Sequence, residues 1–128
     1  MFCKQTLFAA LLAVVLISPS NAFFYNGHVN QNIQEAFNAA QEAFRSTVTC
    51  MKEGKSSCPD AIEAAKKAKR YAEAAHSDDI SSLAKTRVRN AIDILEKAIE
   101  ELNGNWLNEA ERRVGYAMGE LDEARKAL

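Results

Sequence analysis

Glycine and proline are scarce in this sequence, with 5 Gly and 2 Pro among 128 residues. All-β and dinucleotide-binding folds need many tight turns, and this composition offers little material for them. The 3 Cys and 2 His do not have the paired spacing of a finger-type zinc site, and there is no phosphate-binding loop, G-x-G-x-x-G or C-x-x-C-H haem motif. The remaining composition, 48% hydrophobic and 26% charged, is typical of a small helical domain.

The amino-terminal segment has the layout of a secretory signal peptide. Lys4 precedes an apolar run from Leu7 to Ile17, and small residues lead up to a cleavage site after Ala22. This run is much shorter than the roughly 20 residues that cross a bilayer as a helix, so cleavage is favoured over a retained membrane anchor. We therefore predict a signal peptide over residues 1–22, a mature domain over residues 23–128, and a periplasmic or secreted location.

Cleavage leaves 106 residues with 15 basic and 17 acidic side chains, a formal charge of −2. This chain lacks the basic excess of a nucleic-acid-binding protein. It keeps two cysteines, Cys50 and Cys58, and an isolated pair in an exported protein predicts one disulfide. We expect the bond to be structural, because a redox-active pair is typically spaced C-x-x-C beside a helix N-terminus.

Four segments carry apolar residues at alternating steps of three and four, which predicts four amphipathic helices. The first is expected from about Asn30 to Cys50. The second begins at Pro59, a favoured first helical residue, with Asp60 and Glu63 spaced as a capping box. The predicted buried seams are Ile33, Phe37, Ala40, Phe44, Thr47 and Met51, flanked by Ala36, Ala43 and Val48, and then Ala61, Ala65, Ala68, Ala72 and Ala75.

The third helix is expected to follow the N-cap candidates in Ser77-Asp78-Asp79 and to end at Asn103-Gly104. Asn105 is then expected to cap a fourth helix that extends to Leu128. The predicted seams of these helices are Ile80, Ala84, Val88, Ala91, Leu95, Ala98 and Leu102, and Leu107, Ala110, Val114, Ala117, Leu121, Ala124 and Leu128.

Connections of a few residues between long helices force neighbouring helices to run antiparallel. The pattern of the first helix also returns in the third, since Ala36-Phe37 and Ala43-Phe44 recur 55 residues later as Ala91-Ile92 and Ala98-Ile99. The sequence therefore predicts an all-α fold, an up-down-up-down antiparallel four-helix bundle built from a duplicated helical hairpin.

Carboxylates gather around the turn between the third and fourth helices. Glu100 and Glu101 precede this turn, and Glu109 and Glu111 follow it. Converging carboxylates are ligands for hard or borderline divalent cations, so Glu100, Glu101 and Glu109 form one candidate metal site. Repulsion between them predicts that neutralising Glu101 and Glu109 stabilises the metal-free protein.

The two histidines are further candidate metal ligands. His76 is followed by Asp78 and Asp79, and His28 lies in the aromatic segment after the signal peptide. For each histidine the alternative is a surface or helix-capping role. Tyr71, Tyr116 and Trp106 are expected at core edges or in turns.

Lysines and arginines of the second and third helices are expected to form a basic end opposite the carboxylates, although solvated helix faces are a commoner reason for such charges. The sequence shows no Ser or Cys nucleophile with a partner His, so we predict no enzymatic activity.

The stretch Ile33 to Ala75, echoed from Thr86 to Ala124, resembles the small metal-binding protein family of the bacterial periplasm. The motifs that carry the likeness are Gln34-Glu35-Ala36-Phe37, Gln41-Glu42-Ala43-Phe44, Lys52-Glu53-Gly54, Ile62-Glu63-Ala64-Ala65-Lys66, Ala91-Ile92 and Leu95-Glu96-Lys97-Ala98-Ile99. The resemblance implies an exported four-helix bundle that binds divalent metals, copper above all, through histidines at seven-residue spacing. On our alignment those histidines fall on Ala39, Ser46, Ala64, Tyr71, Ile94, Glu101, Glu109 and Tyr116, so Glu101 and Glu109 retain a ligating group.

Two functions from different classes follow. The first is weak binding or buffering of a divalent metal ion, with copper, zinc and manganese as the candidates. The alternative is a non-enzymatic structural or protein-interaction module of the cell envelope that binds no metal. Neither function involves nucleic acid or a membrane anchor after cleavage, and the protein partner of the second is not identified.

Overall fold

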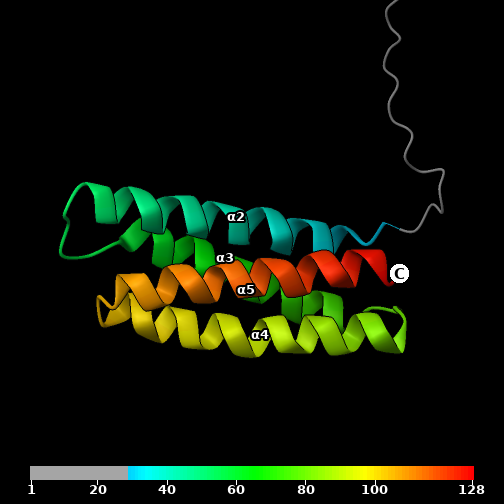
Figure 1. Ribbon diagram of the computed structural model, residues 1–128. Coiled ribbons are helices and arrows are strands. Elements are labelled where there is room, and N and C mark those ends of the chain that lie inside the picture. Colours follow the sequence, from blue (N-terminus) through cyan, green and yellow to red (C-terminus); the bar gives the residue numbers. More distant parts are fainter. Residues whose placement is uncertain (1–28) are drawn as a thin grey trace, which may run out of the picture.

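The computed structural model describes residues 29–128, which form four helices and no strand. The helices are α2 (Gln31–Lys52), α3 (Pro59–His76), α4 (Ser82–Asn103) and α5 (Leu107–Lys126). They lie side by side, and each packs on two neighbours in the order α2, α3, α4, α5 and back to α2 (Figure 1). The predicted antiparallel four-helix bundle is confirmed. The predicted signal peptide, residues 1–22, and His28 lie outside the described residues.

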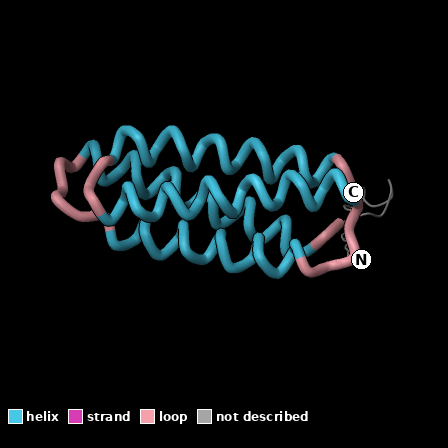
Figure 2. Tube along the Cα trace, turned by 90° about the horizontal axis from the view of Figure 1, so that it is seen from below, coloured by secondary structure: helices cyan, strands magenta, loops and turns pink. Residues whose placement is uncertain are grey.

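The two ends of the bundle differ in what they contain. The α2–α3 and α4–α5 connections lie together at one end, whereas the α3–α4 connection, the start of the described chain and the C-terminus lie at the other (Figure 2). We call the first of these the loop end, and define it as residues 51–58 and 104–109.

Alanines dominate the core. The large side chains that are fully buried are Ile33, Thr47, Val88, Leu95, Leu102, Val114 and Leu121. Every buried residue of α3 is an alanine, as the sequence pattern predicts. Because its buried side chains are all small, α3 contributes little side-chain volume to the core. The predicted seam positions Phe37, Phe44 and Met51 are half-buried, because Ala36, Ala43 and Cys50 point more directly inward.

The structure corrects the predicted cap of α3 and the predicted start of α4. Pro59 is the first residue of α3, but the N-cap is Cys58 and no side chain caps this helix, so the predicted capping box of Asp60 and Glu63 does not form. Helix α4 begins at Ser82 rather than directly after the predicted N-cap candidates at 77–79. Its N-cap is Ser81, whose hydroxyl accepts a hydrogen bond from the amide of Ala84 at 3.0 Å.

The N-cap predicted for α5 is also wrong. Asn105, predicted to cap α5, instead has a φ of 63° and ends α4, and Trp106 is the N-cap of α5. The amide of Asn105 donates to the Leu102 carbonyl at 3.1 Å, and the amide of Trp106 donates to the Glu101 carbonyl at 2.8 Å. These two bonds form a Schellman motif, the C-terminal cap in which one residue adopts a left-handed conformation.

Helix α2 ends with the same motif. Gly54 has a φ of 65°, its amide donates to Met51 at 3.1 Å, and the amide of Lys55 donates to Cys50 at 3.2 Å. The helices that lead into the two connections at the loop end therefore end in the same motif, although the connection after α2 is longer than the one after α4. Lys55 and Trp106 hold the same position in the two motifs.

A disulfide joins Cys50 to Cys58 across the first of these connections, as predicted from the sequence, with the two Cα atoms 6.0 Å apart. Cys50 lies in the last turn of α2 and Cys58 is the N-cap of α3. Both residues are buried. The bond thus ties the end of one helix to the start of the next and limits the movement of the loop between them.

Candidate functional site

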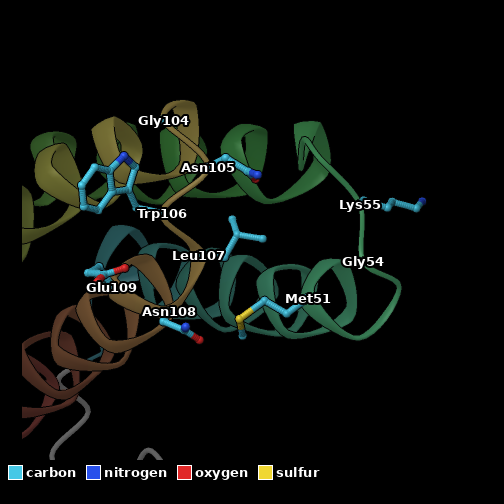
Figure 3. Close-up of a pocket in the computed structure, with 9 residues that line it drawn as sticks. All are labelled: Met51, Gly54, Lys55, Gly104, Asn105, Trp106, Leu107, Asn108 and Glu109. Carbon is cyan, nitrogen blue, oxygen red and sulfur yellow. The ribbon is translucent and has the colours of Figure 1, made fainter.

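A hollow of about 550 Å³ lies at the loop end between the two Schellman motifs (Figure 3). We call it the loop-end hollow. Residues from both connections and from the adjoining helix ends line it: Met51, Gly54, Lys55, Gly104, Asn105, Trp106, Leu107, Asn108 and Glu109. It is wide and shallow, and its volume falls within the range of roughly 300–1,000 Å³ that is usual for ligand pockets.

Trp106 is the most unusual residue of the hollow. Its side chain is 63% exposed, although the sequence predicts a tryptophan at a core edge or in a turn. It occupies the N-cap position of α5, where Ser, Thr, Asp or Asn is strongly preferred, and makes no capping hydrogen bond through its side chain. The residue lies in a turn as predicted, and most of its surface is open to solvent.

Gly104 explains how the indole is held. A Cβ atom added at Gly104 would lie 2.8 Å from Cδ1 of Trp106 and 3.0 Å from its Nε1. The indole therefore packs directly against a backbone that carries no side chain. Because this glycine sits at the C-cap, the left-handed conformation of the Schellman motif falls on Asn105, one of the residue types that tolerate it best.

Charges at the loop end are balanced. Lys55 on the rim pairs with Glu53, with Nζ and Oε1 3.1 Å apart, in the open solvent. Glu109 supplies the one carboxylate of the hollow and Lys55 its one ammonium group. Figure 3 shows Trp106 and Asn105 projecting to opposite sides of the α4–α5 turn, with Leu107 between them and Lys55 extending away from the bundle.

Among the carboxylates predicted to hold a metal ion, Glu101 has a cationic partner. Its Oε2 accepts a hydrogen bond from Nε of Arg113 at 2.8 Å, and its side chain is 17% exposed. Its other oxygen, Oε1, is buried and has no hydrogen-bond partner among the described residues. Glu100 is exposed and Glu109 is half-buried beside the hollow. The positive charge of Arg113 offsets part of the repulsion expected between Glu101 and the neighbouring carboxylates.

The other predicted ligands are dispersed. His76 is the last residue of α3, at the end of the bundle opposite the loop end. The side chain of Asp78 accepts hydrogen bonds from Asn30 and Asn32. Within residues 29–128, no group of three or more His, Cys, Asp and Glu side chains is arranged to hold a metal ion. The proposed metal ligands therefore stay predictions.

Three of the positions at which the resemblance would place histidines line another hollow, of about 330 Å³, between α2 and α3. They are Ala39, Ser46 and Ala64. None of these three side chains is a metal ligand of the family type, and Ala39 and Ala64 are nearly completely buried.

Two of the basic residues on these helices form ion pairs along the sides of the bundle. Lys69 lies in the middle of α3, and its Nζ is 3.2 Å from Glu96 and 3.9 Å from Glu73. Arg87 of α4 pairs with Glu120 of α5 at 3.2 Å. These pairs agree with solvated helix faces as the reason for the charges, and the basic end stays a prediction.

Comparison with known proteins finds no family model, no curated protein and no solved structure that matches this chain. Within residues 29–128, no helix combines the length and the hydropathy needed to cross a membrane. The loop-end hollow was missed by sequence reasoning because its two walls are 50 residues apart in the chain. The one local signal was Trp106 between a glycine-asparagine pair and the first turn of a helix.

Proposed function

We propose that this protein is an exported, non-enzymatic binding module that contacts its ligand through the loop end. The observation that carries the proposal is the exposed indole of Trp106 at an uncapped helix start. A polar N-cap there would stabilise the helix by about 1 kcal/mol, and Trp106 makes no capping hydrogen bond through its side chain. Residues that break local preferences in this way concentrate at functional sites.

The disulfide supports both the binding site at the loop end and the export of the protein. Cys50 and Cys58 bracket the connection that carries Gly54 and Lys55, so the wall of the hollow opposite Trp106 is held in place. A fixed wall lowers the entropy that a ligand must remove on binding. Structural disulfides persist in oxidising compartments, which agrees with export directed by residues 1–22.

An amide-resolved NMR titration tests this function. The ¹⁵N-labelled protein is titrated separately with neutral oligosaccharides, a pool of blocked tetrapeptides and anionic phospholipid vesicles. We expect at least one probe to shift amides within residues 51–58 and 104–109, and Trp106→Ala to abolish the shifts. Tyr116→Ala is the matched control, because Tyr116 is also exposed, at 61%, and does not line the hollow. If no probe shifts these amides, or if all shifts lie elsewhere, the proposal is wrong.

Weak divalent metal binding is the second candidate function. A specific observation favours it, since Oε1 of Glu101 is buried without a hydrogen-bond partner in the described chain. A buried carboxylate oxygen left in this way calls for a water molecule or a cation. Carboxylate ligands favour manganese or zinc over copper at such a site, with Glu109 and Glu100 as the nearest further ligands along the chain.

Calorimetric titration with Cu²⁺, Zn²⁺ and Mn²⁺ separates the two functions. If a metal ion binds at Glu101 and Glu109, the titration should give a heat of binding. The double change Glu101→Gln with Glu109→Gln should remove this heat, and His28→Ala and His76→Ala should leave it unchanged. Loss of the heat in either histidine variant would instead move the site to that histidine. Absence of heat with all three metals in the micromolar range leaves the binding module as the function.

A further inference from the structure

The loop-end hollow combines a flat aromatic surface with amide side chains. The indole of Trp106 provides the flat surface, and Asn105 and Asn108 provide the amides. Leu107 and Met51 form an apolar region between the two connections (Figure 3). A ligand for this hollow therefore needs an apolar face and, beside it, groups that form hydrogen bonds.

Two contacts place the indole at the α4–α5 turn, one from the backbone of Trp106 and one from its ring. The amide of Trp106 is held by the carbonyl of Glu101 at 2.8 Å, and the ring packs against Gly104, where any Cβ atom would collide with it. The electron-rich face of an indole attracts polarised C–H groups. The axial C–H groups on one face of a pyranose ring are of this kind, and they form a flat patch of matching size.

The charge of the hollow favours a neutral ligand. Lys55 and Glu109 contribute one charge of each sign, so neither an anion nor a cation is preferred. An asparagine side chain both donates and accepts hydrogen bonds, as sugar hydroxyls do. The polar side chains that line the hollow thus match a neutral ligand with many hydroxyl groups.

The shape of the hollow decides between a sugar and a peptide. A protein partner gains most of its binding energy where an aromatic or apolar anchor enters an enclosed, desolvated pocket. The loop-end hollow is shallow and open, and both apolar and polar residues line it. Such a surface suits a chain of rings that lies along it, with one face on the protein and the other in water.

We propose that the loop-end hollow binds a neutral oligosaccharide, with one pyranose ring stacked on Trp106 and neighbouring rings crossing Leu107 toward Asn105 and Lys55. This inference rests on the proposed function and names the ligand class of the same site. Because the hollow is shallow, we expect dissociation constants of about 0.1–10 mM for short oligosaccharides.

The test uses the single tryptophan of the chain as a reporter. The exported protein is titrated with cellohexaose, maltohexaose and chitotetraose, and the emission of Trp106 and the ¹⁵N–¹H spectrum are recorded together. We expect at least one of these sugars to shift the emission saturably and to shift the amides of residues 104–109. Trp106→Ala, followed by NMR, should weaken binding by about tenfold or more.

Trp106→Phe and Tyr116→Ala are the two informative controls. Phenylalanine keeps an aromatic face, so Trp106→Phe should bind more tightly than Trp106→Ala, and Tyr116→Ala should bind as well as the parent. Circular dichroism of each variant verifies that the bundle is intact. Equal binding by the parent and Trp106→Ala would overturn the inference.

The same spectra distinguish the failure of this inference from the failure of the proposed function. If the tetrapeptide pool shifts the loop-end amides and none of the three sugars does, the sugar inference is wrong and the binding module stands. If vesicles alone shift them, the ligand is a lipid surface and the sugar inference is again wrong. If nothing shifts them, both proposals fail.

Discussion

The side-chain amide of Asn30 donates a hydrogen bond to Oδ2 of Asp78 at 3.0 Å, which joins the start of α2 to the connection between α3 and α4. The oxygen of the same side chain caps α2, accepting from the amide of Ile33 at 2.9 Å. Asn32 donates to the same carboxylate oxygen at 2.9 Å. One carboxylate therefore orients the first turn of α2 at the end of the bundle opposite the loop end.

These contacts predict a pH-dependent stability. Hydrogen bonds from Asn30 and then Asn32, with a smaller effect of the Lys85 charge, lower the pKa of Asp78 from its ordinary value of 3.8. A carboxylate with a lowered pKa in the folded state stabilises the fold above the unfolded-state pKa, and this contribution is lost as the pH falls through the folded-state pKa. Asp78→Ala should thus lower the melting temperature near neutral pH, and the difference from the parent should shrink as the pH falls below 3.8 and through the lowered pKa of Asp78.

Asp79→Ala is the control for this measurement. It removes the same charge at the adjacent, exposed position, for which the structure gives no side-chain hydrogen bond. Melting curves of the three proteins by circular dichroism, between neutral and acid pH, provide the comparison. Identical curves for the two variants would mean that the amide contacts of Asp78 add nothing to stability.

Loss of the disulfide should lower stability without unfolding the helices. Replacing Cys50 and Cys58 together by Ala, or reducing the bond, releases a loop of about nine residues, which corresponds to roughly 2–3 kcal/mol in the chain-entropy model. Urea denaturation measures this difference, while helical circular dichroism at room temperature should persist. Intact mass with and without alkylation verifies the oxidised state, and two freely alkylated thiols in protein from the oxidising compartment would contradict the bond.

Gly104→Ala should displace the indole of Trp106. Its added Cβ would lie 2.8 Å from Cδ1 of the ring, whereas the φ of −88° at Gly104 suits alanine well. The emission maximum and quenching of the single tryptophan should therefore change, with a change in the free energy of unfolding of no more than about 1 kcal/mol. Sugar binding should weaken in parallel. An unchanged emission spectrum would mean that Gly104 does not fix the ring.

Two other glycines should respond to alanine in opposite directions. Gly119 lies in the exposed interior of α5 with nothing within 4 Å of an added Cβ, so Gly119→Ala should stabilise the protein by about 0.5–1 kcal/mol. Gly54 has a φ of 65°, and Gly54→Ala should destabilise it by about 1 kcal/mol. Chemical denaturation of both variants measures the change in the free energy of unfolding. If the two changes have the same sign, this assignment of backbone strain is wrong.

Glu101→Gln should destabilise the metal-free protein, which is the reverse of the expectation from charge repulsion. The change replaces a charge-assisted hydrogen bond to Arg113 by a neutral one, and a loss of about 0.5–1 kcal/mol is expected because Arg113 is 40% exposed. Glu109→Gln is the comparison and should be nearly neutral, since the structure gives Glu109 no ion pair among the described residues. If Glu101→Gln instead stabilises the protein, repulsion between Glu101 and the neighbouring carboxylates outweighs its bond to Arg113, and this prediction is wrong.

The periodic spacing of apolar residues was sufficient to predict the fold. Helices bury one stripe, and residues such as Val88, Leu95 and Leu102 repeat at the spacing of that stripe, so the number of helices and their inward faces follow from the sequence. Short connections then leave antiparallel packing as the solution. The Cys50–Cys58 bond was predictable as well, because the predicted loss of residues 1–22 leaves each of these cysteines a single possible partner.

The helix caps and the site depended on contacts that the sequence does not encode locally. Asn105 is as good a candidate for an N-cap as for a left-handed C-terminal position, and the choice was made by the packing of Trp106 against Gly104. Glu101 and Arg113 lie 12 residues apart, and the turn of the second hairpin brings them into contact. The loop-end hollow likewise exists because the folded bundle brings two connections that are far apart in the sequence to the same end. Local periodicity determined the helices of this protein, and the tertiary packing of its turns decided which side chains meet.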